Sequence, residues 1–217
     1  MQDLIKQEVF ELEVLDRLNS LRLLGDIVFC GGTMMRLCFG LNRFSVDLDF
    51  WVTDKVSRPK LFREIKSALA KDYKITDSAD KFYTMLFEIS SKDFPSSLKI
   101  EIRKETKKIR PEQAIAYSRF SNTQVFLKVV PLKDMMAAKI EAFLDRKEIR
   151  DAFDMEFLLK RGVPLDASKE TKLRLKQGIL ALAKKDYTVK LGSLLEPGER
   201  KYYTSENFKI MLAALVN

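Results

Sequence analysis

The stretch that decides the fold runs Phe29-Cys-Gly-Gly-Thr-Met-Met-Arg-Leu-Cys-Phe-Gly-Leu-Asn-Arg-Phe-Ser-Val-Asp-Leu-Asp-Phe50. Gly31 and Gly32 allow the backbone to approach a ligand closely, because glycine has no side chain. Asp47 and Asp49 lie two residues apart in a segment that alternates polar and apolar residues, so both carboxylates point to one face of a strand. Two neighbouring carboxylates repel one another unless a cation lies between them. The stretch therefore predicts a site for a metal-bound nucleotide.

The composition is that of a globular protein. The chain has 217 residues, of which 46% are apolar and 32% are charged, enough for one large domain or a domain with a helical extension. No apolar run approaches the roughly 20 residues of a membrane span, and the first residues lack the apolar core of a signal peptide. We therefore expect a cytoplasmic protein. Cys30 and Cys38 form no metal-type pair, and we expect both to be thiols of the core.

The charged residues restrict the chemistry. The chain has no histidine, which excludes Ser-His-Asp and Cys-His catalysis and His-based zinc sites. A formal charge of +8 and a pI near 9.3 favour a polyanionic partner. Much of the charge lies in Arg103-Lys-Glu-Thr-Lys-Lys-Ile-Arg110. Two interpretations of this segment stay open: a nucleic-acid contact, or a solvated loop or helix start.

Periodicity predicts an α+β protein. Apolar residues at helical spacing cover 4–24, a buried strand covers 27–30, and a helix covers 34–39 with Thr33 near its cap and Gly40 at its end. Glu101 lies on a predicted strand, where a lone acid is usually just solvated. Methionines 135, 136 and 155 are expected to fill the core. The remaining predicted strands cover 46–52, 73–77, 82–89, 98–103 and 125–130, and the remaining helices cover 59–70, 132–143, 153–158, 168–184 and 206–216.

These elements predict two domains, a small mixed sheet with helices in residues 1–130 and a helical C-terminal domain in residues 131–217.

Neither the G-x-x-x-x-G-K-[ST] phosphate loop nor the G-x-G-x-x-G dinucleotide fingerprint occurs in the sequence. The two major nucleotide-binding folds are therefore excluded.

Three separated motifs carry a resemblance to a known family. Gly31-Gly-Thr33 followed by Arg43-Phe-Ser-Val-Asp-Leu-Asp-Phe50 resembles the first motif of the AbiEii/AbiGii-type nucleotidyltransferase toxins, which belong to the polymerase-beta-like superfamily. Pro131-Leu-Lys-Asp-Met-Met-Ala-Ala-Lys139 is similar to the lysine-bearing helix of that family, and Arg146-Lys-Glu-Ile-Arg-Asp-Ala-Phe-Asp154 is similar to its R-x-x-[KR]-D-x-x-D motif. The resemblance covers residues 27 to 162. It implies a polymerase-beta-like core followed by helices.

The resemblance implies roles for the acidic residues and the glycine turn. Asp47 and Asp49 would be ligands of two magnesium ions, with manganese as an alternative, and Glu101 would be the third carboxylate and help to deprotonate the acceptor. Gly31, Gly32 and Thr33 would hold the triphosphate at a helix N-terminus, unless they form an ordinary strand-to-helix turn. Arg43 and Ser45 flank the carboxylates and complete the nucleotide-binding set. For Arg43 the sequence leaves two roles open, contact with phosphate or a structural pair with an acid.

The later motifs imply further site residues. Lys139 would bind phosphate near the leaving pyrophosphate, or else be an exposed helix lysine. Asp151 and Asp154 lie on one face of a helix, with Arg146 and Arg150 as an adjacent basic pair, and intrahelical ion pairs would explain all four. The family pattern favours Asp151 as the functional acid and Asp154 as a structural partner. Together, Lys139 and Asp151 are expected to complete the active site from the helical domain.

The predicted function is the transfer of a nucleoside monophosphate from an NTP to an acceptor hydroxyl. The family implies RNA, in particular the tRNA acceptor end, with a protein acceptor as an alternative, and a neutralising AbiEi-type antitoxin. Met34-Met35 and Val46 depart from the family pattern beside the chemical positions, which bears on substrate details. The competing hypothesis is a non-catalytic nucleotide- or RNA-binding module that keeps the fold.

Overall fold

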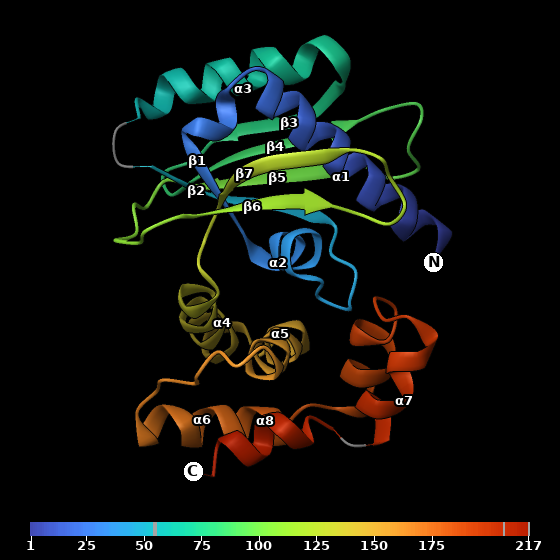
Figure 1. The fold of residues 1–217 in the computed structure, drawn as a ribbon, viewed down its shortest axis with the longest axis vertical. Coiled ribbons are helices and arrows are strands. Elements are labelled where there is room, and N and C mark those ends of the chain that lie inside the picture. The colour runs from blue at the N-terminus through green and yellow to red at the C-terminus, as the bar shows by residue number, and fades with distance from the viewer. Residues whose placement is uncertain (54–55, 206, 217) are drawn as a thin grey trace. The chain divides into compact units, whose positions relative to one another are not determined.

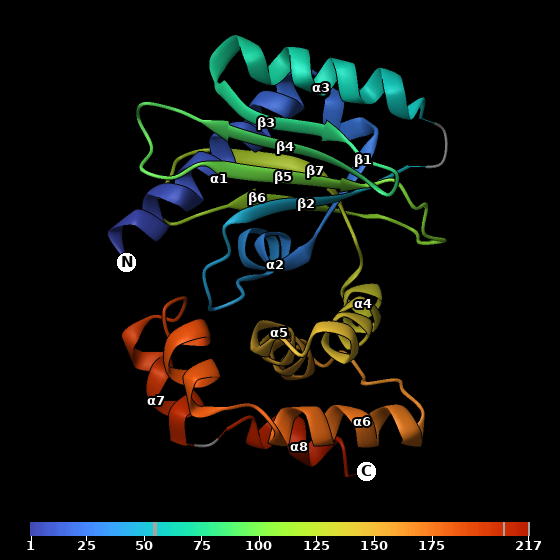
Figure 2. The ribbon, with the colours of Figure 1, turned by 180° about the vertical axis from the view of Figure 1, so that it is seen from behind.

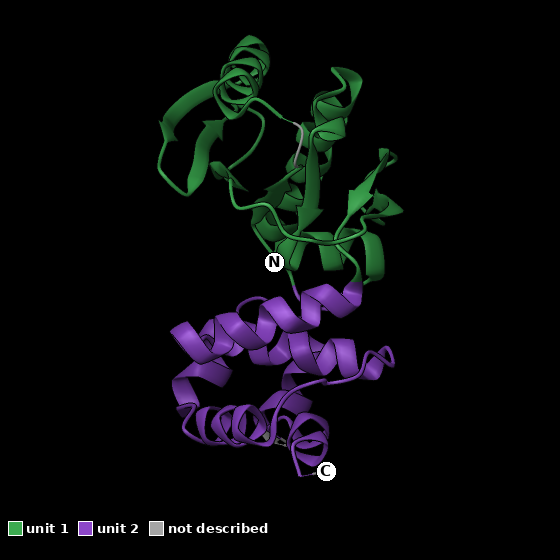
Figure 3. Ribbon diagram, turned by 90° about the vertical axis from the view of Figure 1, so that its left-hand side faces the viewer, with its two compact units in different colours: residues 1–40, 44–131 green, residues 41–43, 132–217 purple. Residues whose placement is uncertain are grey.

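The protein divides into two compact units in the computed structural model, which describes residues 1–53, 56–205 and 207–216 (Figure 3). Unit 1 consists of residues 1–40 and 44–131, and unit 2 of residues 41–43 and 132–217. Unit 1 contains the β-sheet and unit 2 is helical, which confirms the predicted α+β class with a helical C-terminal part. Within the described residues, no helix is both long and apolar enough to cross a membrane.

A seven-stranded mixed sheet forms the centre of unit 1, in the order β3-β4-β5-β2-β1-β7-β6. Strand β1 pairs antiparallel with β2 and parallel with β7, and β2 pairs parallel with β5; the other neighbours are antiparallel. The all-apolar β1 is buried at each of its four positions, as a central strand should be. The strands are β1 (Ile27–Cys30), β2 (Asp47–Val52), β3 (Lys74–Asp80), β4 (Thr84–Ser90), β5 (Leu98–Arg103), β6 (Glu112–Tyr117) and β7 (Gln124–Val129).

Strand β6 is the one strand of this sheet that the sequence did not predict. Its residues Glu-Gln-Ala-Ile-Ala-Tyr favour a helix or an exposed segment, and they form an edge strand because β7 pairs with them along their whole length. The basic segment 103–110 lies mostly in the loop that leads to β6, so it is a loop and not a helix start.

The helices of unit 1 differ from the prediction at their ends. Helix α1 (Gln2–Ser20) stops before the predicted end, because Arg22 has a left-handed φ of 61° and starts the 3₁₀ turn η1 (Leu23–Gly25). Helix α2 (Gly31–Phe39) begins earlier than predicted, so Thr33 lies in its first turn and the predicted cap was wrong. Gly40, with φ 74°, ends α2 as predicted, and α3 covers Arg58–Asp72.

Helices α2 and α3 lie on opposite sides of the sheet (Figures 1 and 2). Phe62 of α3 stacks on Phe87 of β4, with ring centroids 4.9 Å apart. On β2, the side chains of Leu48 and Phe50 are buried in the core, while Asp47 and Asp49 are only partly buried. The predicted alternation is therefore present over the first four residues of this strand, and it places the two carboxylates on the face opposite Leu48 and Phe50.

Unit 2 is built from helices joined by short loops. The methionines at positions 135, 136 and 155 are at most 2% exposed, which confirms the prediction that they fill the core. The sequence did not predict the polar helix α7, and residue 206 of the last predicted helix lies outside the described residues. The elements are α4 (Leu132–Arg146), α5 (Ile149–Lys160), α6 (Lys169–Leu180), the π-helical turn η2 (Asp186–Leu191), α7 (Pro197–Ser205) and α8 (Lys209–Ala214).

Candidate active site

The three predicted carboxylates of unit 1 lie on two neighbouring strands. Strands β2 and β5 run parallel, and their register places Asp49 directly opposite Glu101 and Asp47 opposite Lys99. Opposed residues of adjacent strands are about 5 Å apart and point to the same face. The sheet therefore brings Asp47, Asp49 and Glu101 together, although 52 positions separate Asp49 from Glu101 in the sequence (101 − 49).

A lysine shares this face with the carboxylates. The ammonium of Lys99 forms an ion pair with the carboxylate of Glu101. This hydrogen bond, with the nearby charges of Asp47 and Asp49, raises the pKa of Lys99 above its usual value. Lys99 is a residue that the sequence prediction missed, and the signal was available, since it precedes Glu101 by two positions on the same strand face.

The carboxylates suit a hard divalent cation, since oxygen ligands of this kind are those that magnesium prefers. With the side chains as they stand, the described part of the chain contains no group of three or more His, Cys, Asp and Glu residues that could hold a metal ion. The ion pair between Glu101 and Lys99 gives a physical reason for this absence, because the Lys99 ammonium already neutralises one of the three carboxylates. A cation held by Asp49 and Glu101 would have to compete with the Lys99 ammonium.

Gly31 follows strand β1, opens helix α2 and lies against Asp49 of the neighbouring strand β2. Its φ is +80°, and a Cβ at this position would lie 2.6 Å from Oδ2 of Asp49. Any other residue would therefore be strained and would collide with the carboxylate. Because Gly31 and Gly32 open α2, their N–H groups belong to the helix terminus, where backbone donors and the helix dipole favour an anion.

Thr33 and Ser45 lie close to the carboxylates in the sequence and differ in burial. The side chain of Thr33 is 0% exposed, and its hydroxyl donates a hydrogen bond of 2.6 Å to the backbone carbonyl of Asp47. Thr33 thus fixes the start of β2 to the first turn of α2. Ser45 is partly buried just ahead of β2.

The charged residues of the later motifs form a cluster within unit 2. Arg43 donates from Nε and Nη2 to the two carboxylate oxygens of Asp154, at 2.7 and 2.8 Å. Lys139 Nζ lies 3.1 Å from Asp151 Oδ1 and 2.7 Å from Asp154 Oδ2. Arg146 binds both oxygens of Asp151, at 2.7 and 2.8 Å. Both aspartates are 0% exposed, so two buried carboxylates are held by three cations.

This cluster decides several open predictions. Lys139 is 8% exposed, so the interpretation as an exposed helix lysine was wrong. Of the two alternatives for Arg43, the structure shows the pairing with an acid. The expected basic pair on one helix was also wrong, because Arg146 ends α4 whereas Arg150 lies in α5.

Electrostatics keep Asp154 ionised. Burial by itself would raise the pKa of Asp154, but the charges of Arg43 and Lys139 and their hydrogen bonds outweigh it and hold the pKa below its usual value. Lys139 and Asp151 belong to unit 2, whereas Asp47, Asp49 and Glu101 belong to unit 1. That they complete one active site stays a prediction.

Unit 1 contains a second polar cluster that the sequence did not reveal. Glu8 of α1 forms an ion pair with Arg36 of α2 and accepts a hydrogen bond from Ser118. Glu11, one turn further along α1, is 0% exposed, and neither of its carboxylate oxygens has a hydrogen-bond partner within the described residues. Burial, with the charges of Glu8 and Asp47, raises the pKa of Glu11 well above its usual value, against a lowering contribution from Arg36. Burial without a hydrogen-bond partner among the described residues therefore favours the neutral form of Glu11. Both cysteines were predicted to be core thiols. The prediction is confirmed for Cys30, which is buried, but was wrong for Cys38, which is only partly buried.

Two solved structures are similar to this chain in fold. A protein of H. pylori assigned as a nucleotidyltransferase has a similar crystal structure, with a TM-score of 0.56 and 22% identity over 94% of this chain and 96% of that chain. JHP933 from Helicobacter pylori gives a TM-score of 0.54 and 22% identity over 94% of each chain. These similarities confirm the nucleotidyltransferase-like fold.

No curated protein matches the sequence. The family model described as nucleotidyl transferase AbiEii toxin, type IV TA system, matches residues 13–213, which extends past the region of the three motifs. The chain therefore belongs to the AbiEii family of nucleotidyltransferases, the toxins of type IV toxin–antitoxin systems.

Proposed function

We propose that this nucleotidyltransferase transfers a nucleoside monophosphate from an NTP to a hydroxyl group of RNA, with the acceptor end of tRNA as its target. The observation that carries the proposal is the register of β2 and β5, which sets Asp49 beside Glu101 and leaves Asp47 on the same face. The net charge of +8 supports a nucleic-acid acceptor. A protein hydroxyl is the alternative acceptor.

In the proposed reaction, the acceptor oxygen forms a bond to the α-phosphorus of the NTP. The bond between that phosphorus and the oxygen bridging to the β-phosphorus breaks, and pyrophosphate leaves with the electron pair. Glu101 is the proposed acceptor of the hydroxyl proton, once it is released from Lys99. The N–H groups of Gly31 and Gly32 are assigned to the triphosphate, because they open helix α2 beside Asp49.

Asp47, Asp49 and Glu101 are the residues that would hold divalent metal, for which we propose two magnesium ions, or manganese in their place. Such ions supply charge stabilisation at the attacking and leaving oxygens. Lys139 is assigned to the leaving pyrophosphate and Asp151 to holding Lys139, in line with their contact at 3.1 Å. Asp154 and Arg43 then act as structural partners of the same lysine.

As the toxin of a toxin–antitoxin system, the protein has an antitoxin counterpart. We propose an AbiEi-type protein for this role. A competing function, a non-catalytic module that binds nucleotide or RNA, is favoured by one observation: Glu101 is paired with Lys99, so the three acids are not assembled around a common centre.

The test is to incubate the purified protein with magnesium, each α-labelled NTP in turn and a total tRNA pool, beside Asp49→Asn. We expect label on RNA with the wild type and a loss of at least about 100-fold in the variant, since even residues behind the metal ligands are worth 10–100-fold. Asp77→Asn, which changes an exposed acid on β3, is the matched control and should keep full activity.

Two outcomes would contradict the proposal in different ways. Transfer that persists in Asp49→Asn would contradict the carboxylate assignment. Binding of NTP or RNA by the wild type without transfer to any acceptor would favour the non-catalytic module.

A further inference from the structure

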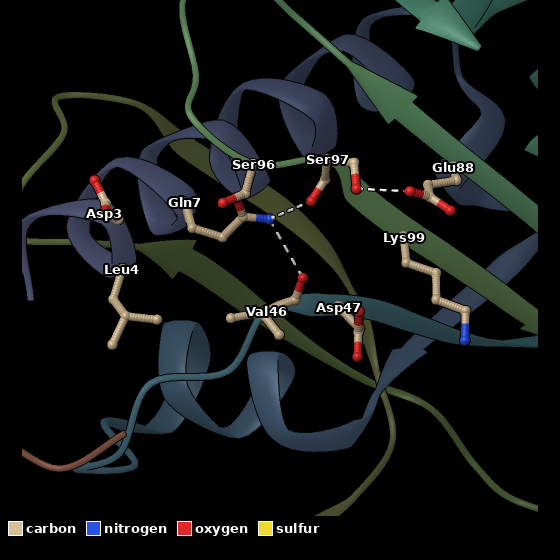
Figure 4. Close-up of a pocket in the computed structure, with 9 residues that line it drawn as sticks. All are labelled: Asp3, Leu4, Gln7, Val46, Asp47, Glu88, Ser96, Ser97 and Lys99. Carbon is tan, nitrogen blue, oxygen red and sulfur yellow. Dashed lines mark hydrogen bonds between the residues drawn. The ribbon is translucent and has the colours of Figure 1, made fainter. Parts of the chain in front are cut away.

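A cavity of about 370 Å³ opens beside the candidate carboxylates in unit 1 (Figure 4). It lies where β2 and β5 begin, and the first turns of α1 close one side of it. A volume of this size is at the lower end of small-ligand sites and fits about one nucleoside. The lining residues are Asp3, Leu4, Gln7, Val46, Asp47, Glu88, Ser96, Ser97 and Lys99.

The buried side chain of Gln7 organises the lining of this cavity. Its side chain is 3% exposed, and its amide nitrogen donates to the carbonyls of Val46 and Ser97, at 3.4 and 3.2 Å (Figure 4). Helix α1 thereby holds the two residues that directly precede strands β2 and β5. The amide oxygen Oε1 is buried without a hydrogen-bond partner in the described chain. This oxygen has almost no accessible surface, so Gln7 shapes the cavity by holding the two segments in place rather than by direct contact with a ligand.

The charge of the lining discriminates between ligands. Asp3, Asp47 and Glu88 contribute three carboxylates, and the single ammonium, that of Lys99, is already paired with Glu101 outside the set. Glu88 is also an acceptor, because the hydroxyl of Ser97 donates to it at 2.6 Å. The lining therefore repels phosphate and favours an uncharged group that is rich in hydroxyls.

The position of the cavity relative to the sheet assigns it to one reactant. Gly31 follows β1, which lies on one side of β2, whereas Glu88 and Lys99 belong to β4 and β5 on the other side of β2. The triphosphate is proposed at Gly31, beside Asp49. In phosphoryl transfer the attacking and leaving oxygens lie on opposite sides of the phosphorus. The cavity thus lies on the side from which the acceptor attacks.

We infer that this cavity holds the 3′-terminal nucleoside of the RNA acceptor, with the ribose hydroxyls directed towards Asp47 and the 5′ side at the opening. The inference rests on the proposed function and specifies its acceptor subsite. The terminal ribose hydroxyl supplies the oxygen that bonds to the α-phosphorus, pyrophosphate leaves, and the proton passes to the carboxylates. Because the lining is negative, the inference predicts that an end without a 3′-phosphate is preferred.

Direct binding tests the cavity without any need for turnover. Adenosine, cytidine, guanosine and uridine, and the 3′- and 5′-monophosphates of each, are titrated against the full-length protein by NMR. We expect at least one nucleoside to bind, its 5′-monophosphate to bind comparably, and its 3′-monophosphate to bind at least tenfold more weakly. Failure of all four nucleosides to bind, or tighter binding of the 3′-monophosphate, would overturn the inference.

Two variants localise the binding. Leu4→Trp fills the cavity from the first turn of α1, and Gln7→Met removes the amide; each should weaken nucleoside binding at least tenfold without changing NTP affinity. Leu173→Trp, at an exposed position of α6, is the matched control. Thermal melting identifies a variant that fails to fold. Because Leu4→Trp fills the cavity whereas Gln7→Met removes an amide, a single folded variant is sufficient for the test. Unchanged nucleoside binding in a folded variant of either kind would contradict the assignment.

The kinetic experiment separates this inference from the proposed function. In a transferring enzyme, Leu4→Trp and Gln7→Met should raise the KM for RNA at least tenfold and leave the KM for NTP unchanged. An increase in the NTP KM alone would place the nucleotide in the cavity and refute the acceptor subsite. If the wild type transfers nothing, the proposed function fails, while the binding experiment still decides whether the cavity takes a nucleoside.

Discussion

Gly31 lies directly against the carboxylate of Asp49, so closely that a methyl carbon on Gly31 would be 2.6 Å from Asp49 Oδ2. The same residue has a φ of +80° and opens helix α2. One glycine therefore turns the chain from β1 into α2 and makes room for an acid of the neighbouring strand. The relationship joins the two halves of the first motif into a single geometric unit.

Replacement of Gly31 by alanine should remove activity through Asp49. The left-handed backbone should cost about 1–2 kcal/mol of folding stability, and displacement of the Asp49 carboxylate should lower transfer at least about 100-fold. Gly162→Ala is the control, since Gly162 has a φ of +79° but nothing within 4 Å of the added carbon. Urea denaturation and the labelled-RNA assay measure both effects. Equal activity in the two variants would show that the contact with Asp49 does not matter.

Removal of the Lys99 ammonium should strengthen metal binding. Lys99→Met frees Glu101 and takes a positive charge from the face that carries Asp47 and Asp49, so affinity for a divalent cation should rise about tenfold, an ordinary size for the loss of one nearby like charge. Titration of Mn²⁺ followed by electron paramagnetic resonance measures the affinity. Lys66→Met, on the exposed part of α3, removes the same charge elsewhere and should have no effect. Weaker binding in Lys99→Met would contradict the prediction.

Neutralising Asp154 should destabilise the protein. Asp154→Asn leaves the buried Arg43 and Lys139 with one carboxylate fewer, which should cost about 3–5 kcal/mol. The folded pKa of Asp154 lies below the unfolded value of about 3.9, so its contribution is present above that pH and is lost as the pH falls through the folded pKa. Urea denaturation between pH 3 and pH 7 should show a shallower acid loss in the variant. Asp166→Asn, at an exposed position, should keep the wild-type profile.

Glu11 should make the protein less stable as the pH rises. Its pKa is raised in the folded state, so the folded protein holds a proton that the unfolded chain releases above about pH 4.3, and stability falls from there towards the folded pKa. Glu11→Met keeps a similar volume without a charge and should gain about 1–3 kcal/mol at pH 7. Urea denaturation at pH 5 and pH 8 measures the difference. A gain of the same size in Glu170→Met, on exposed α6, would mean that burial of the acid is not the cause.

Local patterns predicted most of the elements because those elements depend on near neighbours. The four apolar residues of β1 and the alternation of β2 were sufficient, and Gly40 ended α2 at the predicted position, where it has a left-handed φ. Strand β6 escaped prediction because its strand conformation depends on pairing with β7, not on its own residues. Thr33 does not cap α2 because the helix already begins at Gly31, with Cys30 as its N-cap, and the Thr33 hydroxyl donates instead to the carbonyl of Asp47.

The sequence by itself determined the family and the candidate site residues: the glycine turn, the Asp47 and Asp49 pair on one strand face, and the later lysine and aspartate motifs. These features follow from residue type and from spacing within one element. Only the tertiary structure decided which distant residues share a surface, because strand register sets that, and it placed Glu101 opposite Asp49 and added Lys99. Likewise, burial turned Lys139, Asp151 and Asp154 into a paired cluster, since charges removed from water must find partners.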